Sequence, residues 1–567
     1  MMTAALLRIT GAIAASLGSA CTALPPSPEG LKSACEGLGA QAVAATAIGL
    51  PTSGAKVRSA SWVAAAGATS TGTTHAPATP EFCKLVGSIA SVDPSAASIN
   101  FQLNLPLTWN GKAVQYGGGG YNGTLVTGLA PLRDAAPDDP LPLMRGYATF
   151  GTDSGHQASA FPPNAIGQFG LNDEMLTNYA YASYKKVRDV AVVLMRSLYG
   201  KAPNRLYYFG GSEGGREGLT MAQRFPADYD GVVSIVPVVQ LSMLFQSYLP
   251  RQVPQFNGGW MSPAKVATLA SFVAQACDAL DGLSDGVVSN YLACPAHVNL
   301  QGLRCAGGGD IGDTCLSDAQ IATVRAVHSE YPFAFPLANG LASYPPSLYG
   351  NETTPEPANA TMVRWVTGTS APTQAVDAVT ASQQWLYGAN FVRFFIAKDP
   401  GFDVRTYDPA NFKRRVQQVS ELIDSSNPDL SAFFARGGKL ILRENMADLA
   451  QSPLAGINYF NSVVAKLGAV TVDRSARLYV SPGSTHSGNA TSVTTAAAVP
   501  TMVDLLDPLD EWVSSGTPPR EPLVQTVKAS APPFAVRASR PLCRYPDYPH
   551  YRAGDAARAS SYTCTPP

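Results

Sequence analysis

The chain has 567 residues, with Lys+Arg 40 against Asp+Glu 41 and a formal net charge of −1. It carries no basic excess to neutralise phosphates, which argues against a nucleic-acid partner. Its length and 46% hydrophobic residues suit several domains or one large domain with an insertion. No segment after the N-terminal one has the ~18 uninterrupted apolar residues of a membrane-spanning helix, so we expect no transmembrane segment.

Residues 1–21 are typical of an export signal. Arg8 precedes a short apolar run from Ile9 to Ala20, and small residues stand before Cys21 as at a cleavage site. Cys21 is also a candidate for lipidation, but Leu17 lies one position too early for the usual pattern, so we favour simple cleavage. We therefore expect a secreted or periplasmic protein, with a lipid anchor as the alternative, and a monomer.

The cysteine count supports export. Removing Cys21 with the signal leaves eight cysteines, and an even number in an oxidising compartment predicts four disulfides. Eight cysteines allow 105 pairings in principle. Proximity in the sequence favours Cys35–Cys83, Cys277–Cys294, Cys305–Cys315 and Cys543–Cys564. No CxxC pair exists, which makes zinc a poor alternative.

Strands and helices alternate through the first part of the chain. The pattern predicts strands at 99–106, 113–116, 146–150 and 232–236, and a helix at 178–199 that stops at Gly200. Such alternation indicates an α/β fold with a mostly parallel sheet covered on both faces. The pattern lapses from about 239 to 427 and returns with strands near 437–442 and 477–480. We therefore predict a catalytic domain formed by residues 22–238 and 429–567, with residues 239–428 inserted as a lid.

The segment 206–218 carries the strongest motif. An apolar strand, Leu206 to Phe209, leads into Gly210-Gly211-Ser212-Glu213-Gly214, and a helix-like segment follows from Glu217 to Arg224. Strand, tight turn with a central serine and helix are the context of a nucleophile elbow. The alternative is a glycine-rich turn with an incidental serine. Four glycines after an earlier strand, Gly117 to Gly120, form either a flexible loop or the loop that supplies a second oxyanion N–H.

In hydrolases with this elbow the acid and then the histidine follow the serine. His486 directly follows the strand near 477–480, and Asp448 lies in the loop after the preceding strand, with Glu444 as the reserve acid. His156 precedes Ser212, which argues against it as the base. His486 could instead be an ordinary surface-loop histidine, but order and context favour it as the base.

A dense acidic loop lies inside the inserted region. Asp278, Asp281 and Asp285 could supply side-chain oxygens to Ca²⁺, and Leu283 and Val287 could supply carbonyls. The spacing is not that of an EF-hand. A helix C-terminus followed by Asx turns explains the same residues equally well.

Several of these stretches together resemble the tannase and feruloyl esterase family of secreted α/β-hydrolases. They are 210–218, 223–226, 229–231, 277–286 and 540–543, and the resemblance runs from about Cys35 to the C-terminus. It implies a triad, an oxyanion hole built from two backbone N–H groups, a lid and a lid-bound Ca²⁺. In this sequence the triad would be Ser212, Asp448 and His486, the oxyanion donors Gly120 and Glu213, and the Ca²⁺ ligands the Asp278–Val287 loop.

Two departures from the family pattern matter. Most members carry a disulfide between cysteines just before the nucleophile and just after the histidine, where this chain has Gly211 and Ser487. The region 366–384 contains no Arg or Lys to bind a substrate carboxylate, unlike the lid of the terephthalate monoester hydrolase of this family. Trp365 resembles the tryptophan that stacks on the aromatic acyl group, although simple lid packing explains it as well.

These residues predict a secreted serine carboxylester hydrolase for aromatic esters with no organic cofactor. Neutral hydroxycinnamate (feruloyl), galloyl or terephthaloyl diesters are favoured over a free monoacid, because the lid arginine is missing. A terephthalate monoester hydrolase proper is one alternative. A non-catalytic, calcium-stabilised binding protein on a hydrolase fold is the alternative from another class.

Overall fold

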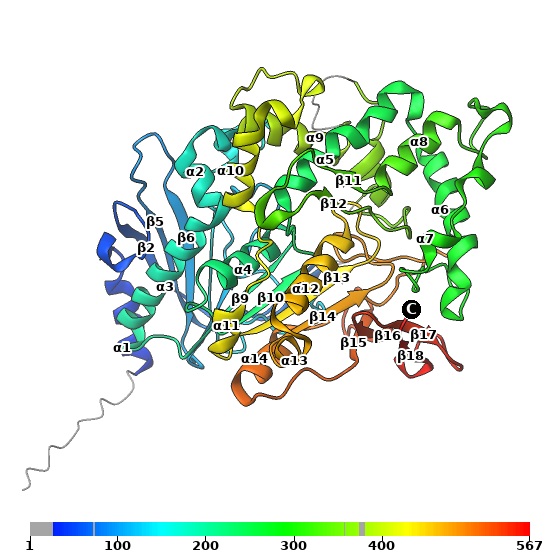
Figure 1. Cartoon of the computed structure of the whole chain (residues 1–567). Coiled ribbons are helices and arrows are strands. Elements are labelled where there is room, and N and C mark those ends of the chain that lie inside the picture. The colour runs from blue at the N-terminus through cyan, green and yellow to red at the C-terminus, as the bar shows by residue number, and fades with distance from the viewer. Residues whose placement is uncertain (1–26, 72–73, 357, 374–379) are drawn as a thin grey trace, which may run out of the picture.

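A twelve-stranded mixed sheet crosses the molecule, in the order β1-β2-β5-β6-β8-β7-β9-β10-β13-β14-β16-β15. The computed structural model describes residues 27–71, 74–356, 358–373 and 380–567 (Figure 1). The predicted signal at 1–21, with Cys21, lies outside the described residues. The chain has the α/β-hydrolase fold that the alternation of strands and helices predicts, with helices on both faces of the sheet.

The middle of the sheet is parallel and holds the predicted strands except 99–106, which pairs antiparallel as β6 (Ile99–Pro106). β8, β7, β9, β10, β13 and β14 run in the same direction, so their carboxyl ends meet at one edge. Their bounds are Ala148–Thr152, Lys112–Tyr116, Arg205–Gly211, Gly231–Ile235, Lys439–Asn445 and Ala476–Ser481. The third strand begins at Ala148 rather than at the predicted Gly146, whose φ of 85° suits the turn before it.

The two faces of the sheet bury alternate side chains of each strand. In β9, Leu206 and Tyr208 pack on one face and Tyr207 and Phe209 on the other. Helices α3 (Ser183–Tyr199), α4 (Glu213–Arg224) and α12 (Pro453–Leu467) cover the first face, and α14 (Leu506–Ser515) covers the second. Both faces are dry, which explains why these strands read as continuous apolar runs.

Residues 239–428 lie between β10 and β13 and are mostly helical. We call this stretch the insertion. It contains α5 (Leu241–Pro254), α6 (Pro263–Cys277), α7 (Cys294–His297), α8 (Asp318–Val327), α9 (Gln383–Asn390) and α10 (Lys413–Ile423), with a short β11–β12 pair, Tyr331–Pro332 and Ser343–Tyr344. In Figure 1 these green and yellow elements lie together above β9, β10 and β13. The insertion therefore stands over the edge at which the parallel strands end.

Both ends of the chain add strands that sequence patterns did not reveal. At the N-terminal side, α1 (Pro28–Gly37) precedes β1 (Ala42–Val43) and β2 (Ala55–Val63), which pairs with β5 (Phe82–Ile89) and through it with β6 (Ile99–Pro106). At the C-terminal side, β15 (Leu523–Lys528) and β16 (Val536–Arg544) extend the sheet antiparallel, and β17 (Tyr548–Tyr551) pairs with β18 (Tyr562–Thr565). β6 is nearly fully buried, although its apolar residues alternate with polar ones as in a half-buried strand.

The four disulfides are those that proximity predicts: Cys35–Cys83, Cys277–Cys294, Cys305–Cys315 and Cys543–Cys564. Two of them tie the ends of the chain down, and two lie in the insertion. Four disulfides indicate folding in an oxidising compartment. Among the residues that the structure describes, no helix is both long and apolar enough to cross a bilayer.

Candidate active site

Ser212 is the single residue between the end of β9 and the start of α4, where the chain turns sharply. Its backbone adopts φ 59° and ψ −125°, a region that costs a non-glycine residue on the order of 1–3 kcal/mol. The Ser212 N–H donates to the carbonyl of Ile235 on the next strand at 2.8 Å, which fixes the turn. Helix α4 begins at Glu213, one turn earlier than the sequence pattern indicates, so the serine lies directly at the helix N-terminus.

Two of the flanking glycines are required by crowding. A Cβ on Gly210 would lie 2.9 Å from the Cα of Gly214, and a Cβ on Gly214 would lie 2.7 Å from the carbonyl oxygen of Gly118. These contacts are closer than a real Cβ tolerates. The glycines therefore let α4 and the Gly117–Gly120 loop approach the strand end closely enough to surround Ser212.

The structure brings Ser212, His486 and Asp448 into one hydrogen-bonded chain. His486 Nε2 lies 2.8 Å from Ser212 Oγ, and His486 Nδ1 lies 2.7 Å from Asp448 Oδ2. Asp448 is fully buried, and its Oδ1 accepts the N–H groups of Ala450 at 2.7 Å and Gln451 at 3.0 Å. The aspartate is thus fixed by its own loop, which in turn fixes the orientation of the imidazole.

Glu444, the reserve acid, does not reach His486. It is fully buried on β13, and neither of its carboxylate oxygens has a hydrogen-bond partner. Burial, and then the charge of Asp448, raise the pKa of Glu444 well above its usual range. The glutamate is therefore held as a neutral carboxylic acid, and Asp448 is the partner of the histidine.

The two amides named as oxyanion donors lie at the same place. Gly120 and Glu213 line the cavity in front of Ser212, and neither backbone N–H donates to another described residue. Gly120 has φ 57°, and a Cβ there would lie 2.7 Å from the hydroxyl of Tyr387. Free N–H groups at a helix N-terminus favour a developing negative charge.

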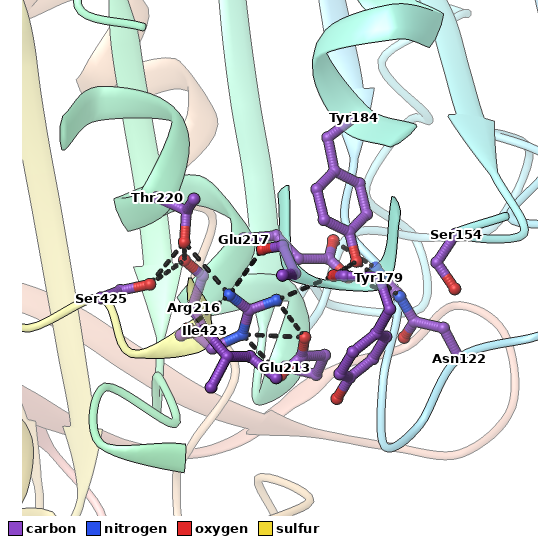
Figure 2. Close-up of polar contacts among 12 residues, drawn as sticks. Asn122, Ser154, Tyr179, Tyr184, Glu213, Arg216, Glu217, Thr220, Ile423 and Ser425 are labelled. Atoms are coloured by element: carbon purple, nitrogen blue, oxygen red, sulfur yellow. Dashed lines mark hydrogen bonds and ion pairs between the residues drawn. The ribbon is translucent and has the colours of Figure 1, made fainter. Parts of the chain in front are cut away.

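Glu217 on α4 holds the glycine loop in place. Its buried carboxylate accepts the Gly118 N–H at 3.0 Å, the Asn122 side-chain amide at 2.6 Å and the Tyr208 hydroxyl at 2.5 Å (Figure 2). The loop and the helix that carry the two candidate oxyanion amides are therefore joined by one side chain. No sequence motif marked this role.

The side chains of Glu213 and Arg216 form a buried ion pair beneath the elbow. Arg216 is fully buried, and its Nε lies 2.8 Å from Glu213 Oε1. Its remaining N–H groups reach the carbonyls of Ala180 and Ile423, both at 2.9 Å (Figure 2). Burial raises the pKa of Glu213 to about 7 although Arg216 opposes the shift. Helix α4 is thus joined to the end of α10 in the insertion.

A cavity of about 440 Å³ opens in front of Ser212. The insertion supplies six of its fourteen lining residues, among them the phenylalanine, the tryptophan and both tyrosines. Trp365 lines it, with its ring 5.5 Å from that of His486. The full lining is Gly120, Arg133, Ser212, Glu213, Val238, Leu244, Phe245, Tyr248, Arg364, Trp365, Tyr387, Ala450, His486 and Ser487.

Two arginines in this lining bear on the expected preference for neutral esters, which was based on the lack of a basic residue in the lid. Residues 366–384 indeed contain no basic residue, but Arg364 and Arg133 enter the cavity from other places. The Nε of each is buried and has no hydrogen-bond partner. Glu213, the only acidic residue lining the cavity in the described part of the chain, is already paired with Arg216. A substrate carboxylate would therefore not lack a cationic partner here.

The acidic loop lies away from the cavity. Its three aspartates have one positively charged partner, Arg540, among the described residues. Asp278 accepts three backbone N–H groups, and Asp285 Oδ2 pairs with Arg540 at 2.5 Å. Asp281 Oδ2 is buried without a partner, and burial raises the pKa of Asp281 to about 7. The structure shows no ready cluster of three or more Asp, Glu, His or Cys side chains among the described residues. The orphaned oxygen and the donor set nevertheless fit a hard cation.

His156 is structural, in line with the sequence argument. It is buried and stacks on Phe169 at 3.7 Å, and burial lowers its pKa to about 3. It therefore stays neutral and takes no part in the cavity.

Comparison with known proteins assigns the family. The model for "Tannase and feruloyl esterase" matches residues 83–565. The chain belongs to the tannase and feruloyl esterase family. It is 37% identical over 555 residues to an uncharacterized esterase of Agrobacterium fabrum, covering 95% of this chain and 94% of that protein. It is 31% identical to mono(2-hydroxyethyl) terephthalate hydrolase of Piscinibacter sakaiensis, with 91% and 89% covered.

A solved structure with a similar name has the same fold. Feruloyl esterase B from Aspergillus oryzae has a crystal structure that matches with a TM-score of 0.72 at 22% identity, covering 94% of this chain and 100% of that one. As a member of this family the protein is a carboxylic ester hydrolase.

Proposed function

We propose that the protein is an exported serine esterase that hydrolyses esters of aromatic acids through an acyl-enzyme on Ser212. One observation carries the proposal: the chain from Ser212 through His486 to Asp448 opens directly into an aromatic-lined cavity. In this proposal Ser212 is the nucleophile, His486 its base and Asp448 the group that orients the base, next to two backbone amides that donate to no other described residue.

The geometry supports a two-step mechanism. Ser212 Oγ attacks the ester carbonyl while His486 Nε2 takes its proton, and the N–H groups of Gly120 and Glu213 hold the oxyanion. His486 then gives the proton to the leaving alcohol, which departs and leaves an ester on Ser212. Water, activated by the same histidine, attacks that ester and releases the acid. Asp448 keeps Nδ1–H oriented throughout.

The cavity wall favours a planar acyl group. Trp365, Tyr387, Phe245 and Tyr248 line the space beside Ser212. Rings prefer offset or edge contacts with another aromatic ring. Two relatives are named mono(2-hydroxyethyl) terephthalate hydrolase and probable feruloyl esterase, and both names point to the same chemistry. In this proposal the insertion serves as the roof of the acyl site.

The test is a matched panel of feruloyl, galloyl, terephthaloyl and short aliphatic esters with the purified protein. We expect the aromatic esters to be hydrolysed, with a burst of alcohol release and an acyl adduct on the Ser212 peptide by mass spectrometry. Absence of both hydrolysis and adduct across the panel would contradict the proposal and favour a non-catalytic binding protein.

One arm of the panel addresses charge. Arg364 in the cavity wall favours acceptance of an acyl group with a free para-carboxylate, against the neutral preference inferred from residues 366–384. We expect the acidic ester to be hydrolysed at least as well as its methyl ester. Arg364→Gln should lower kcat/KM for the acidic ester about 10- to 100-fold, the worth of a charged hydrogen bond. Equal losses on both esters would show that Arg364 does not recognise the carboxylate.

We further propose that the acidic loop holds a structural Ca²⁺. Asp278, Asp281 and Asp285 would supply carboxylates, and Leu283 and Val287 would supply carbonyls. The ion would offset the buried negative charge of the loop and stabilise the insertion. It has no part in the ester chemistry.

Chelation provides the test of the Ca²⁺ site. At free Ca²⁺ 100-fold above Kd, removal of the ion should cost about 2.7 kcal/mol of unfolding free energy. We expect a chelator to lower the Tm of the wild type by several degrees, and metal analysis to find one Ca²⁺ per chain. Asp281→Asn should lose both the ion and the response to the chelator, while Glu511→Gln, an exposed control, should keep them. An unchanged wild-type Tm with no bound metal would refute the site.

A further inference from the structure

Arg133 spans the two active-site loops that no disulfide joins in this chain. It lies in the loop between β7 and β8, far in sequence from both the nucleophile turn and the histidine loop. Its Nη2 donates to the backbone carbonyl of His486. This is the one residue whose guanidinium contacts the histidine backbone in the part of the chain that is described.

The stem of the same side chain lies across Gly211, directly before the nucleophile. A Cβ on Gly211 would lie 2.6 Å from Arg133 Nη1 and 2.8 Å from Nε. Any larger residue at 211 would therefore displace the arginine. A cysteine at 211 and the observed position of Arg133 compete for the same space, which gives a physical reason for glycine at this position.

The backbone at Arg133 is held in place by the residues on either side of it. Leu132 is buried in the core, and the N–H of Val503 donates to the Asp134 carbonyl at 2.8 Å. The Asp134 carboxylate forms an ion pair at 3.2 Å with Arg443, a fully buried residue of β13. Arg133 therefore extends from a fixed backbone, and its side chain can restrain the two loops that it contacts.

We propose that Arg133 is a positioning residue that holds the His486 loop against the nucleophile turn and so sets the distance from His486 Nε2 to Ser212 Oγ. The link is noncovalent and occupies the place where the family resemblance puts a disulfide. The proposal rests on the proposed function for its kinetic consequence, but not for its structural one. Its effect falls on the proton transfer, and thus on kcat rather than on KM.

Arg133→Met tests the hydrogen bond, because methionine keeps an unbranched stem over Gly211 without the donor. We expect kcat to fall about 10- to 100-fold on neutral and acidic esters alike, the worth of a charged hydrogen bond, with KM changed less than about threefold. Exchange of backbone amide hydrogens in the 484–489 peptide should become faster in the same variant.

A crosslink should replace the arginine. In Arg133→Ala, adding Gly211→Cys and Ser487→Cys leaves space for a disulfide between the two loops, whose formation non-reducing peptide mapping would verify. The bonded triple variant should recover at least half of the lost kcat and slow exchange in 484–489. Arg133→Ala with Gly211→Ser, which meets the native Ser487 and cannot form the bond, is the matched control and should recover neither.

Three outcomes would overturn the proposal. One is a loss confined to KM on acidic esters, which would make Arg133 a substrate-binding group. The second is a verified disulfide that restores neither kcat nor slow exchange. The third is unchanged exchange in Arg133→Met. If the wild type forms no acyl adduct on Ser212, the proposed function fails by itself, and the exchange experiment still decides whether Arg133 fixes the loop.

Discussion

Ser212→Ala is expected to lower kcat/KM on a hydrolysed aromatic ester by about five to six orders of magnitude, the usual cost of losing the nucleophile of such a triad. The residual rate comes from the cavity and the oxyanion amides, which the substitution leaves in place. The substitution should also remove every acyl adduct and abolish labelling by a serine-directed phosphonate. Kinetics with an excess of enzyme and intact mass measurement would show both effects.

Ser197→Ala is the matched control for this experiment. Ser197 lies exposed on α3, and its hydroxyl accepts from the Gln41 side-chain amide and donates to the Val193 carbonyl. We expect wild-type kinetics and full phosphonate labelling from that variant. Undiminished labelling of Ser212→Ala would place the nucleophile elsewhere and sink the proposed mechanism.

Arg216→Met should cause the largest loss of stability. It leaves the carboxylate of Glu213 buried without its partner, and breaking a buried pair in this way costs about 3–5 kcal/mol of unfolding free energy. The carbonyls of Ala180 and Ile423 lose their donors as well. We expect a clearly lower midpoint of chemical unfolding, measured by fluorescence. Arg196→Met, at an exposed position of α3, should shift the midpoint little.

The loss in Arg216→Met should depend on pH. The pKa of Glu213 is already raised to about 7 by burial, and removal of the arginine raises it further. The folded state then binds more protons than the unfolded state, so stability falls as pH rises above the ordinary pKa of glutamate, 4.5. The variant should therefore be closer to the wild type at pH 5 than at pH 8. Glu213→Leu with Arg216→Met should recover part of the loss, and equal losses at both pH values would show that Glu213 is not the cause.

Local pattern and chain order predicted the three residues that the structure joins in one hydrogen-bonded chain. Ser212, Asp448 and His486 follow three strand ends, and strand ends of a parallel sheet meet at one edge, so their convergence needed no distance information. The same reasoning preferred Asp448 but kept Glu444 in reserve, because both lie near the end of one strand. Burial decides between them: Glu444 points into the core, and Asp448 sits in the loop.

The residues that shape the cavity were not predictable in the same way. Arg133 and Arg364 belong to no motif, and each reaches the site because its own loop is packed by distant segments. Gly211 was the one available signal, since an absent cysteine leaves space that another side chain can fill. The outer strands at both ends were missed because short, polar, Pro- and Ala-rich segments carry little periodicity and become strands by pairing with neighbours.

The ion pair between Asp285 and Arg540 has a consequence for how ester reaches the enzyme. It fastens the insertion to β16, and the Val493 N–H adds a bond of 2.9 Å to the Gly286 carbonyl beside it. We expect that an insertion attached at Asp285 and Gly286 does not open as a flap. The substrate should therefore enter through the existing opening of the cavity. Such an esterase gains no rate from a lipid–water interface: its velocity should follow the concentration of dissolved ester and saturate smoothly, without the jump at the solubility limit that marks interfacial activation.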